Sequence, residues 1–448
     1  MVLHRRPGYS KALTILTDSK RRDAATVSLF GLLLLSSLFG YPKFPWINTS
    51  VYNLSYPLVL LLVLVVINFE KSKEIFGRHR LTIYLAVTFY GWSWVSALFS
   101  DMQRVAIWYS LRYSIYLFLF LALLPITARA DLRSPLLRLV LRFLIIIGAF
   151  GILEYLGTGR WIFTWMRSPD SLGGSRIASL LQGPNEFSTL MAIGAVLALL
   201  LRRANSISPL ESYLSLPLFI AMVSLSASRN GALLFLLGIF LGWIYRVLNI
   251  KWVIGIFAVW LACVTLLPLT PKQSEIRPSS RYPFRAPTLQ AKPASEPSIT
   301  TMPARPSLWT RVTGALRATA RQVQQDMASR FLLWRAAFDE ITARPVTGIG
   351  LNVFSKQVGK RVLGGEHVYA HNVFLSVSAE MGLPGLLLFL AVLFSVFRSG
   401  PLRKPMVAIP VLLVGFSQVL DYYLHDPTFA TLALFFVAQA ANSKDENH

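Results

Sequence analysis

The sequence has one cysteine and few charged residues. Only 15% of its 448 residues are charged, whereas a soluble domain carries roughly 25%. A disulfide framework is excluded, because Cys263 has no second cysteine to pair with. No His, Cys or acidic cluster has metal-ligand spacing, and no glycine-rich phosphate loop or serine-nucleophile motif occurs. We therefore expect no metal ion and no cofactor.

Hydrophobic residues dominate instead, at 54% of the chain. A helix needs ~20 mostly apolar residues to cross a bilayer. Runs of this kind lie near 24–41, 54–69, 81–100, 105–126, 136–157, 186–201, 212–228, 231–248, 251–268, 373–397, 405–422 and 427–441. The sequence thus predicts an all-α polytopic membrane protein with about twelve transmembrane helices.

Lysine and arginine are concentrated in alternate loops. The N-terminal arm is rich in both, and the series continues near 71–80, 129–133, 202–203 and 398–404. Short cytoplasmic loops attract these residues. We therefore expect both termini in the cytoplasm, with the first apolar run kept as an uncleaved anchor because no small-residue cleavage pattern follows it.

This topology divides the chain into three parts. Residues 1–268 form an N-terminal bundle of about nine helices, with an outer loop at 158–185. Residues 269–371 form one large outer loop, and residues 372–448 form the C-terminal helices and a cytoplasmic tail.

Proline and helical periodicity distinguish two segments of the large loop. Residues 268–306 are proline-rich and predict an extended strap. Apolar residues then recur at helical spacing over about 308–343, which predicts two amphipathic helices on the membrane face, separated near Ser329 as an N-cap.

The large loop also carries an excess of nine positive charges. Long loops escape the positive-inside rule, so this excess does not contradict the topology. It predicts an anionic neighbour, which is either lipid phosphate or a substrate that carries phosphate. Arginine suits the second role because its planar fork binds phosphate oxygens bidentately.

Three arginines are candidates for such a site. Arg229 lies in a tight outer turn directly before the helical run at 231–248, where a helix N-terminus favours anions. Arg330 lies near the start of the helix that bears Trp334, and Arg176 lies in the loop 158–185. The alternative for each is a surface arginine that snorkels to the membrane interface.

A second group of polar residues marks the return of the chain into the membrane. His371 and Asn372 precede the run at 373–397, and Glu380 follows within it. A histidine near arginines can act as a neutral base, although an interfacial structural histidine is the alternative. An acid at the depth of Glu380 needs a partner, and we expect an arginine of the outer site.

The last outer turn holds Asp421, Tyr422, His425 and Asp426. These residues could form a second wall of the same site or a solvated turn. We interpret them as a solvated turn.

The order of several short motifs resembles the O-antigen ligase and polymerase family of bacterial envelope proteins. The motifs are Ser228-Arg229, Arg330 with Trp334, Pro345-x-x-Gly348-x-Gly350, His371-Asn372 and Glu380-x-Gly382. The resemblance covers about 175–390. It implies a GT-C-like glycosyltransferase architecture whose large loop is periplasmic.

The resemblance also implies an activity and a set of site residues. Family members act on undecaprenyl-diphosphate-linked glycans at the periplasmic face of the inner membrane. Ligases transfer the glycan to a lipid A-core sugar, and polymerases extend one glycan with another. The residues that match are His371, Arg229 and Arg330 as catalytic groups, and Arg176, Asn185, Glu380, Asn372 and Trp334 as substrate-binding groups.

The chemistry of such a reaction fits these residue types. A diphosphate is a good leaving group, so the site must stabilise its charge and remove a proton from the acceptor hydroxyl. We expect the arginines to hold the diphosphate without a metal ion and His371 to act as the base, in a single displacement that inverts the anomeric centre. The expected partners are the lipid-linked glycan, the lipid A-core acceptor and membrane lipids, and not nucleic acid.

Other functions stay open from the sequence. A polymerase would use the same donor site. A transporter or flippase also has about twelve spans, but its ionisable groups usually lie near the midplane and its halves repeat. A non-enzymatic scaffold would use the basic loop to bind anionic lipid.

Overall fold

A computed structural model describes seven stretches of the chain, which are 19–38, 49–156, 177–181, 183–266, 327–363, 368–398 and 400–443. Every long regular element in these stretches is a helix. Arg176, the proline-rich strap 268–306 and the predicted helix before 327 lie outside the described residues.

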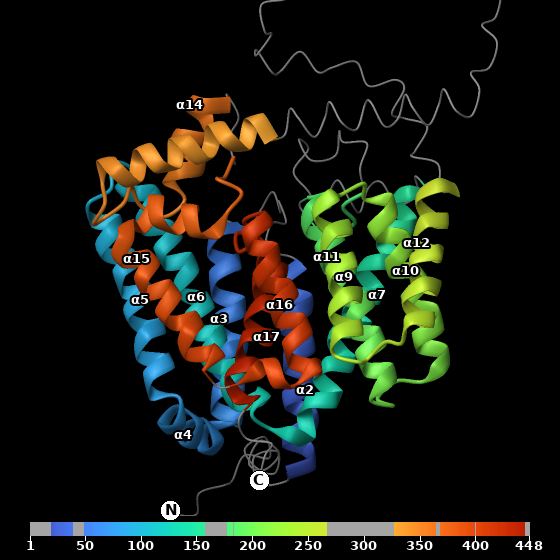
Figure 1. Cartoon of the computed structure of the whole chain (residues 1–448). Coiled ribbons are helices and arrows are strands. Elements are labelled where there is room, and N and C mark those ends of the chain that lie inside the picture. The colour runs from blue at the N-terminus through green and yellow to red at the C-terminus, as the bar shows by residue number, and fades with distance from the viewer. Residues whose placement is uncertain are drawn as a thin grey trace, which may run out of the picture.

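The helices alternate in direction between two ends of a bundle (Figure 1). Their bounds are α2 (Ser19–Leu38), α3 (Thr49–Ile67), α4 (Phe69–Arg78), α5 (Arg80–Leu98), α6 (Gln103–Thr127), α7 (Ala130–Tyr155), α9 (Pro184–Arg203), α10 (Pro209–Leu225), α11 (Arg229–Ile244), α12 (Ile250–Leu266), α14 (Gly359–Leu363), α15 (Val373–Phe397), α16 (Pro405–Leu420) and α17 (Pro427–Ala441). Each of the twelve apolar runs coincides with one of these helices.

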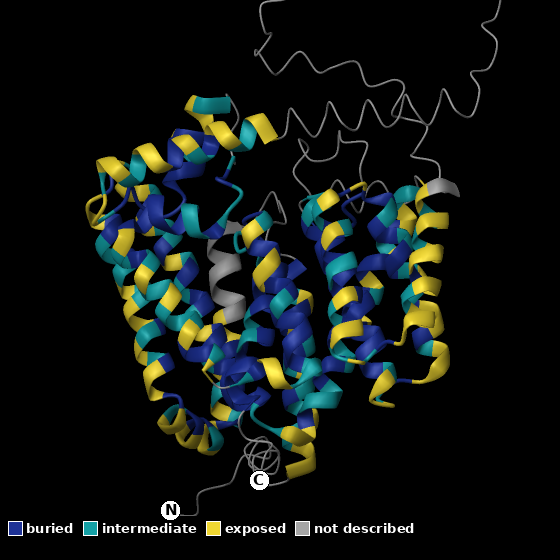
Figure 2. Cartoon of the chain, viewed as in Figure 1, coloured by how far each residue is buried: buried dark blue, intermediate teal, exposed yellow. Residues whose placement is uncertain are grey.

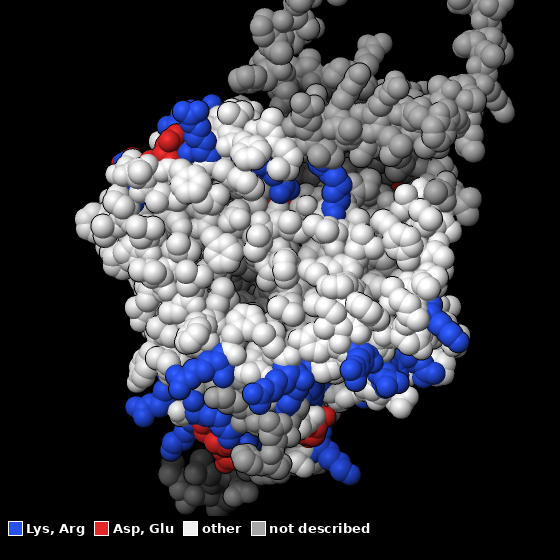
Figure 3. Space-filling model, in the orientation of Figure 1, with Lys and Arg blue, Asp and Glu red and all other residues white. Residues whose placement is uncertain are grey.

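Five of the described helices, α5, α6, α7, α9 and α15, are long and apolar enough to cross a membrane, while several others are apolar but shorter. The flank of the bundle is apolar, with Leu62 at 65% and Phe394 at 72% exposed. Figure 3 shows this flank as a broad belt almost without charge. A surface of this kind suits lipid rather than water, so the chain has the character of a multi-pass membrane protein, and the count of twelve spans stays a prediction.

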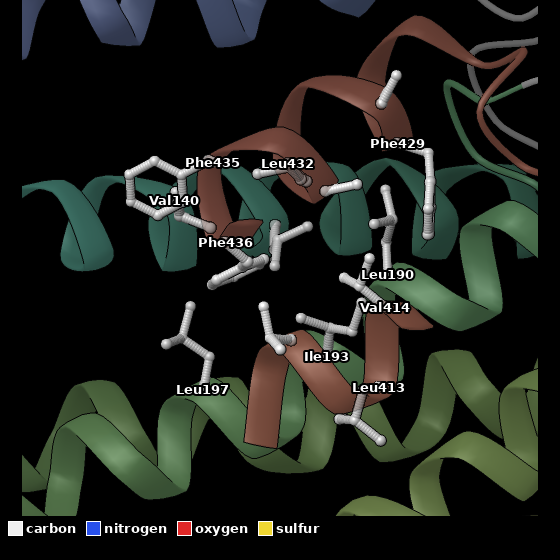
Figure 4. Close-up of a cluster of buried hydrophobic side chains, with 14 of the residues drawn as sticks. Val140, Leu190, Ile193, Leu197, Leu413, Val414, Phe429, Leu432, Phe435 and Phe436 are labelled. Carbon is white, nitrogen blue, oxygen red and sulfur yellow. The ribbon is translucent and has the colours of Figure 1, made fainter. Parts of the chain in front are cut away.

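Helix α9 forms the centre of its half of the bundle. It is buried along most of its length, as the dark ribbon in Figure 2 shows. Its side chains interdigitate with α7, α16 and α17 in the cluster of Figure 4, which includes Val140, Leu190, Ile193, Leu197, Leu413, Val414, Phe429, Leu432, Phe435 and Phe436. This packing brings the last two helices of the chain against one that begins more than 200 residues earlier.

Two glycines let α11 approach α9 closely. A Cβ atom on Gly231 would lie 1.7 Å from the Oγ atom of Ser188, and one on Gly238 would lie 2.4 Å from a methyl group of Val196. Small residues at helix contacts in membranes permit this close packing. The first residues of α11 are thereby held beside the first turn of α9.

Residues 327–343 form one continuous helix (Figure 1, orange). Leu333 and Ala337 are buried on one face, whereas Phe331 and Phe338 are each 59% exposed. The helix expected here is therefore present and buries one face, and its amphipathic character stays a prediction. The predicted N-cap at Ser329 is wrong, because Ser329 is itself helical, and the residues before 327, where a nearby break would fall, lie outside the described residues.

Helix α15 is kinked at Gly382, whose φ of 69° interrupts the helical conformation. The segment after the helix 327–343 packs into this kink. The amide of Leu383 donates to the carbonyl of Pro345, and the amide of Gly350 donates to the carbonyl of Glu380. A Cβ atom on Gly382 would lie only 2.1 Å from the carbonyl oxygen of Val346. Two glycine motifs that are distant in the sequence therefore form one interlocked structure.

Candidate active site

The candidate site is centred on a pair formed by His371 and Asp421. The two residues lie at one end of the bundle, His371 directly before the N-cap of α15 and Asp421 directly after α16. His371 Nδ1 and Asp421 Oδ1 are 2.6 Å apart. The histidine side chain is 31% exposed and that of the aspartate 8% exposed. The pair thus presents a ring to the surface and keeps its carboxylate inside.

The hydrogen bond to Asp421 determines which ring nitrogen of His371 is free to react. An ionised carboxylate only accepts hydrogen bonds, so Nδ1 must carry the proton and donate it. In the neutral ring Nε2 then holds a lone pair. His371 also has a φ of 51°, in the left-handed region that non-glycine residues seldom adopt. Strain of this kind often accompanies functional sites.

Asp421 is also held from the other half of the bundle. Its Oδ2 atom lies 3.3 Å from the Nδ2 atom of Asn185 and 3.5 Å from that of Asn230. The Oδ1 atom of Asn185 accepts a hydrogen bond from Ser228 at 2.9 Å. Asn230 also donates to the hydroxyl of Tyr423 at 3.2 Å. The starts of α9 and α11 therefore fix the carboxylate that orients His371.

The Asp421 carboxyl is held in its ionised form by its neighbours. Burial acts to raise its pKa, but the hydrogen bond and charge of His371, the amide of Tyr422 and the charge of Arg330 outweigh burial and hold the pKa below its ordinary value. The carboxylate therefore stays ionised at neutral pH and can accept the Nδ1 proton of His371.

Arg330 lies beside this pair, and Arg229 lies within range of the charge of Arg330. Arg330 donates to the carbonyl of Leu420 at 2.6 Å, next to Asp421. Arg229 is the first residue of α11, where Ser228 caps the helix by accepting from the amide of Gly231. The charge of Arg330 acts on Arg229. Two arginines whose charges interact, with one at a helix N-terminus, favour an anion in this region.

Asn372 and Trp334 fix the backbone on both sides of His371. Asn372 caps α15 by accepting from the amides of Phe374 and Leu375 at 3.0 and 3.1 Å. The indole of Trp334 donates to the carbonyl of Ala370 at 2.8 Å. Both were predicted as substrate-binding residues, and their described contacts are with this chain's own backbone.

Glu380 lies away from the arginines and is only 2% exposed. The backbone amides of Asn352 and Phe354 interact with it. The prediction that an arginine pairs with Glu380 is therefore wrong for the described residues. Backbone amides have no sequence signature, and hydropathy alone could not reveal the loop that supplies them.

The segment 421–426 is not a solvated turn, and that interpretation is wrong. Tyr422, Tyr423 and Asp426 are at most 4% exposed. His425 stacks on Tyr369 with 4.6 Å between ring centroids. Burial lowers the pKa of His425 to about 4, so the ring is neutral at neutral pH. The segment is instead a packed wall beneath the His371–Asp421 pair.

Asp426 offers a pH-dependent test of this burial. It caps α17, accepting from the amide of Phe429 at 2.8 Å, and burial raises its pKa from the ordinary 3.8 to about 6. Asp426→Asn keeps the cap and removes the buried charge, so we expect the free energy of unfolding at pH 8 to rise by up to about 3 kcal/mol. Unfolding in detergent, followed at pH 8 and at pH 3.5, measures this.

The sign of the effect follows from the two ionisation states. Above pH 6 the carboxyl is ionised in the folded and unfolded chain, and only the folded chain bears the cost of burial. Below the unfolded value of 3.8 it is neutral in both, so the gain disappears. Asp131→Asn is the matched control, because that side chain is 57% exposed and paired with Arg129. A gain that is equal at both pH values would contradict this account of Asp426.

Of the residues predicted for the site, the structure brings His371, Arg330 and Asn185 to Asp421 and places Arg229 within range of the charge of Arg330. Arg176 lies outside the described residues. Asp421 and Asn230 were not predicted as site residues. Two features of the sequence could have indicated these residues. Asn230 directly follows Arg229, and Asp421 is an acidic residue at an outer turn.

Comparison with known proteins finds one family to which part of the chain is similar. Residues 214–390 match the family model described as O-antigen ligase, a range that contains Arg229, Arg330 and His371. No curated protein matches the chain. The family match confirms the resemblance drawn from the sequence motifs and supports glycan transfer of the O-antigen ligase type. Over residues 214–390, the chain is similar to the O-antigen ligase family.

Proposed function

We propose that the chain is an inverting, metal-independent glycosyltransferase that moves a glycan from undecaprenyl diphosphate to a sugar of the lipid A-core. The reaction would take place at the periplasmic face of the bacterial inner membrane. The proposal rests on the family match and on the site geometry.

The observation that carries the proposal is the His371–Asp421 pair beside Arg330, with Arg229 within range of the charge of Arg330. A base oriented by a carboxylate is the arrangement that removes a proton from a hydroxyl. Guanidinium groups next to that base suit a substrate that carries phosphate. A transporter would instead place such groups near the middle of the bundle, whereas these residues lie at helix ends.

The reaction requires one displacement. The acceptor hydroxyl oxygen attacks the anomeric carbon of the glycan as Nε2 of His371 takes the hydroxyl proton. The bond between the anomeric carbon and the diphosphate oxygen breaks, and undecaprenyl diphosphate leaves with both electrons. Attack from the face opposite the leaving group inverts the anomeric centre.

Arg229 and Arg330 would stabilise the charge that develops on the departing diphosphate. Such contacts strengthen as the bond breaks, so they lower the barrier rather than only increase affinity. A fixed pair of guanidinium groups supplies the positive charge that a metal ion supplies in other transferases. Asn185 would act indirectly, because its described contacts hold Asp421 and Ser228.

The distribution of charge supports the proposed orientation. Lysine and arginine gather at the end of the bundle where α4 lies (Figure 3). Arg203 ends α9 and Lys404 precedes α16 at this same end, whereas α9 and α16 have their other termini at the site. By the positive-inside rule, this distribution of charge supports the proposed periplasmic location of the site.

Loss of the gene tests the proposed function. We expect the deletion strain to accumulate lipid-linked glycan chains of normal length that are not attached to lipid A-core. Gel analysis of the surface polysaccharide and of the lipid-linked fraction measures this. The wild-type gene supplied on a plasmid should restore attachment.

Other outcomes identify the alternatives. Single attached repeat units would indicate a polymerase, which shares the donor half of the reaction. Lipid-linked glycan trapped on the cytoplasmic face would indicate a flippase. Either result would contradict the ligase assignment.

A further inference from the structure

An apolar cavity of about 210 Å³ lies inside the bundle, below the candidate site. It is enclosed by α5, α6, α15, α16 and α17. Aromatic rings form much of its wall, among them Phe89, Tyr113, Tyr116, Phe374 and Phe389. Figure 3 shows a hollow in the apolar flank of the bundle, at about the height at which α15 and α16 lie in Figure 1.

The cavity suits an apolar guest. The hydroxyls of two wall residues, Tyr113 and Tyr422, bond to each other at 3.0 Å. Apolar cavities of this kind stay dry, and one of about 150 Å³ holds a benzene molecule, so 210 Å³ takes roughly eight carbon atoms.

The shape of the cavity is that of a slot along the helix axes. Its wall follows α6 from Tyr113 to Phe120, α16 from Val411 to Gln418, and α17 from Ala430 to Val437. Each stretch contains eight residues, whose seven rises of 1.5 Å give a length of about 10 Å. A long slot of small volume fits a chain better than a compact ring.

The outer end of the slot adjoins the candidate site. Tyr422 lines the slot and directly follows Asp421, while Val373 lines it two residues after His371. A chain in the slot would therefore extend inward from directly beneath the His371–Asp421 pair.

Gly415 of α16 marks an opening toward the bilayer. It lines the slot and is itself exposed. A Cβ atom built on Gly415 would meet no atom within 4 Å, so open space lies beside it. A lipid chain can therefore reach the slot from the side of the bundle.

We propose that this slot binds the carbon units of the donor's polyprenyl chain nearest its diphosphate, entering from the bilayer past Gly415. The inference rests on the proposed function. The donor chain is joined directly to the diphosphate, so its first carbons must begin at the site that holds the phosphates. The acyl chains of a lipid A-core acceptor are separated from the reacting sugar by intervening sugars and have no such constraint.

A photoreactive lipid tests this placement. The probe is a polyprenyl monophosphate with a diazirine in its first isoprene units, added to the full-length protein in detergent with phospholipid. We expect it to label peptides of α15, α16 and α17. Gly415→Leu should reduce this labelling at least tenfold, because the new side chain fills the opening without meeting existing atoms.

Gly91→Leu is the matched control. Gly91 is also an exposed glycine within a helix, and its Cβ would likewise meet no atom within 4 Å, but it does not line the slot. We expect this variant to be labelled as strongly as the wild type. Equal labelling of Gly415→Leu and the wild type would overturn the proposal.

Two further arms separate the sources of failure. A phosphatidylglycerol with the same diazirine on its acyl chain should label the slot weakly, and preferential labelling by this lipid would overturn the polyprenyl assignment. Glycan transfer is measured on the same preparations. If labelling depends on Gly415 but no glycan is transferred, the proposed function is wrong and the lipid slot is supported. If glycan is transferred without such labelling, the lipid slot is wrong and the proposed function is supported.

Discussion

Replacement of His371 by asparagine is expected to reduce glycan transfer by about a thousandfold, a rise of roughly 4 kcal/mol in the barrier. Asparagine tolerates the left-handed backbone conformation that residue 371 adopts, at a φ of 51°. Its amide can still hydrogen-bond to Asp421 but cannot take a proton from a hydroxyl. Initial rates with a purified lipid-linked glycan and acceptor measure the loss.

The choice of substitution separates chemistry from folding. His371→Ala removes the hydrogen bond to Asp421 and leaves a buried carboxylate with one partner fewer, so part of its effect would come from lost structure. His371→Asn should match the wild type in expression, membrane insertion and thermal stability. Near-wild-type transfer by either variant would show that His371 is not the base.

The helices were predicted well because hydrophobic length is a local property. Each of the twelve apolar runs coincides with a helix, since a continuous apolar segment must satisfy its own backbone hydrogen bonds. Helix α4 was not predicted as a separate element, because it is amphipathic and lies between two apolar runs.

Asp421 was missed because its role depends on contacts between distant elements. It is 50 residues from His371 and 236 from Asn185. Hydropathy places each of these residues at the end of a helix, but it cannot say which helix ends meet. The packing of α16 and α17 on α9 decides that, and it arises from side-chain shape along the whole interface (Figure 4).

The glycine motifs carried more information than the charges did. Pro345-x-x-Gly348-x-Gly350 and Glu380-x-Gly382 contributed to the family resemblance only as patterns. In the structure they form one contact, where Gly348 and Gly382 adopt positive φ and leave no room for a Cβ atom. Charge at a helix end has several explanations, whereas glycine in a close backbone contact has few.

The second large effect is expected for Arg229. Arg229→Ala should lower kcat and kcat/KM by about a hundredfold, or roughly 3 kcal/mol, because it removes a charge that stabilises the departing diphosphate. Arg229→Lys should recover part of the loss, since lysine supplies charge but not the planar fork. Steady-state kinetics with varied donor concentration measure both variants.

Arg203→Ala provides the matched control for charge. Arg203 is an exposed residue that ends α9 at the opposite end of the bundle from the site, so its loss changes the net charge equally without affecting the diphosphate. We expect transfer by Arg203→Ala to equal that of the wild type. If Arg229 and Arg330 bind one diphosphate, the double alanine variant should lose less than the product of the two single losses. Two results would mean that the positive charge acts on the membrane surface and not on a shared leaving group. One is a loss of transfer in the double variant equal to the product of the two single losses. The other is an equal loss of transfer in Arg229→Ala and Arg203→Ala.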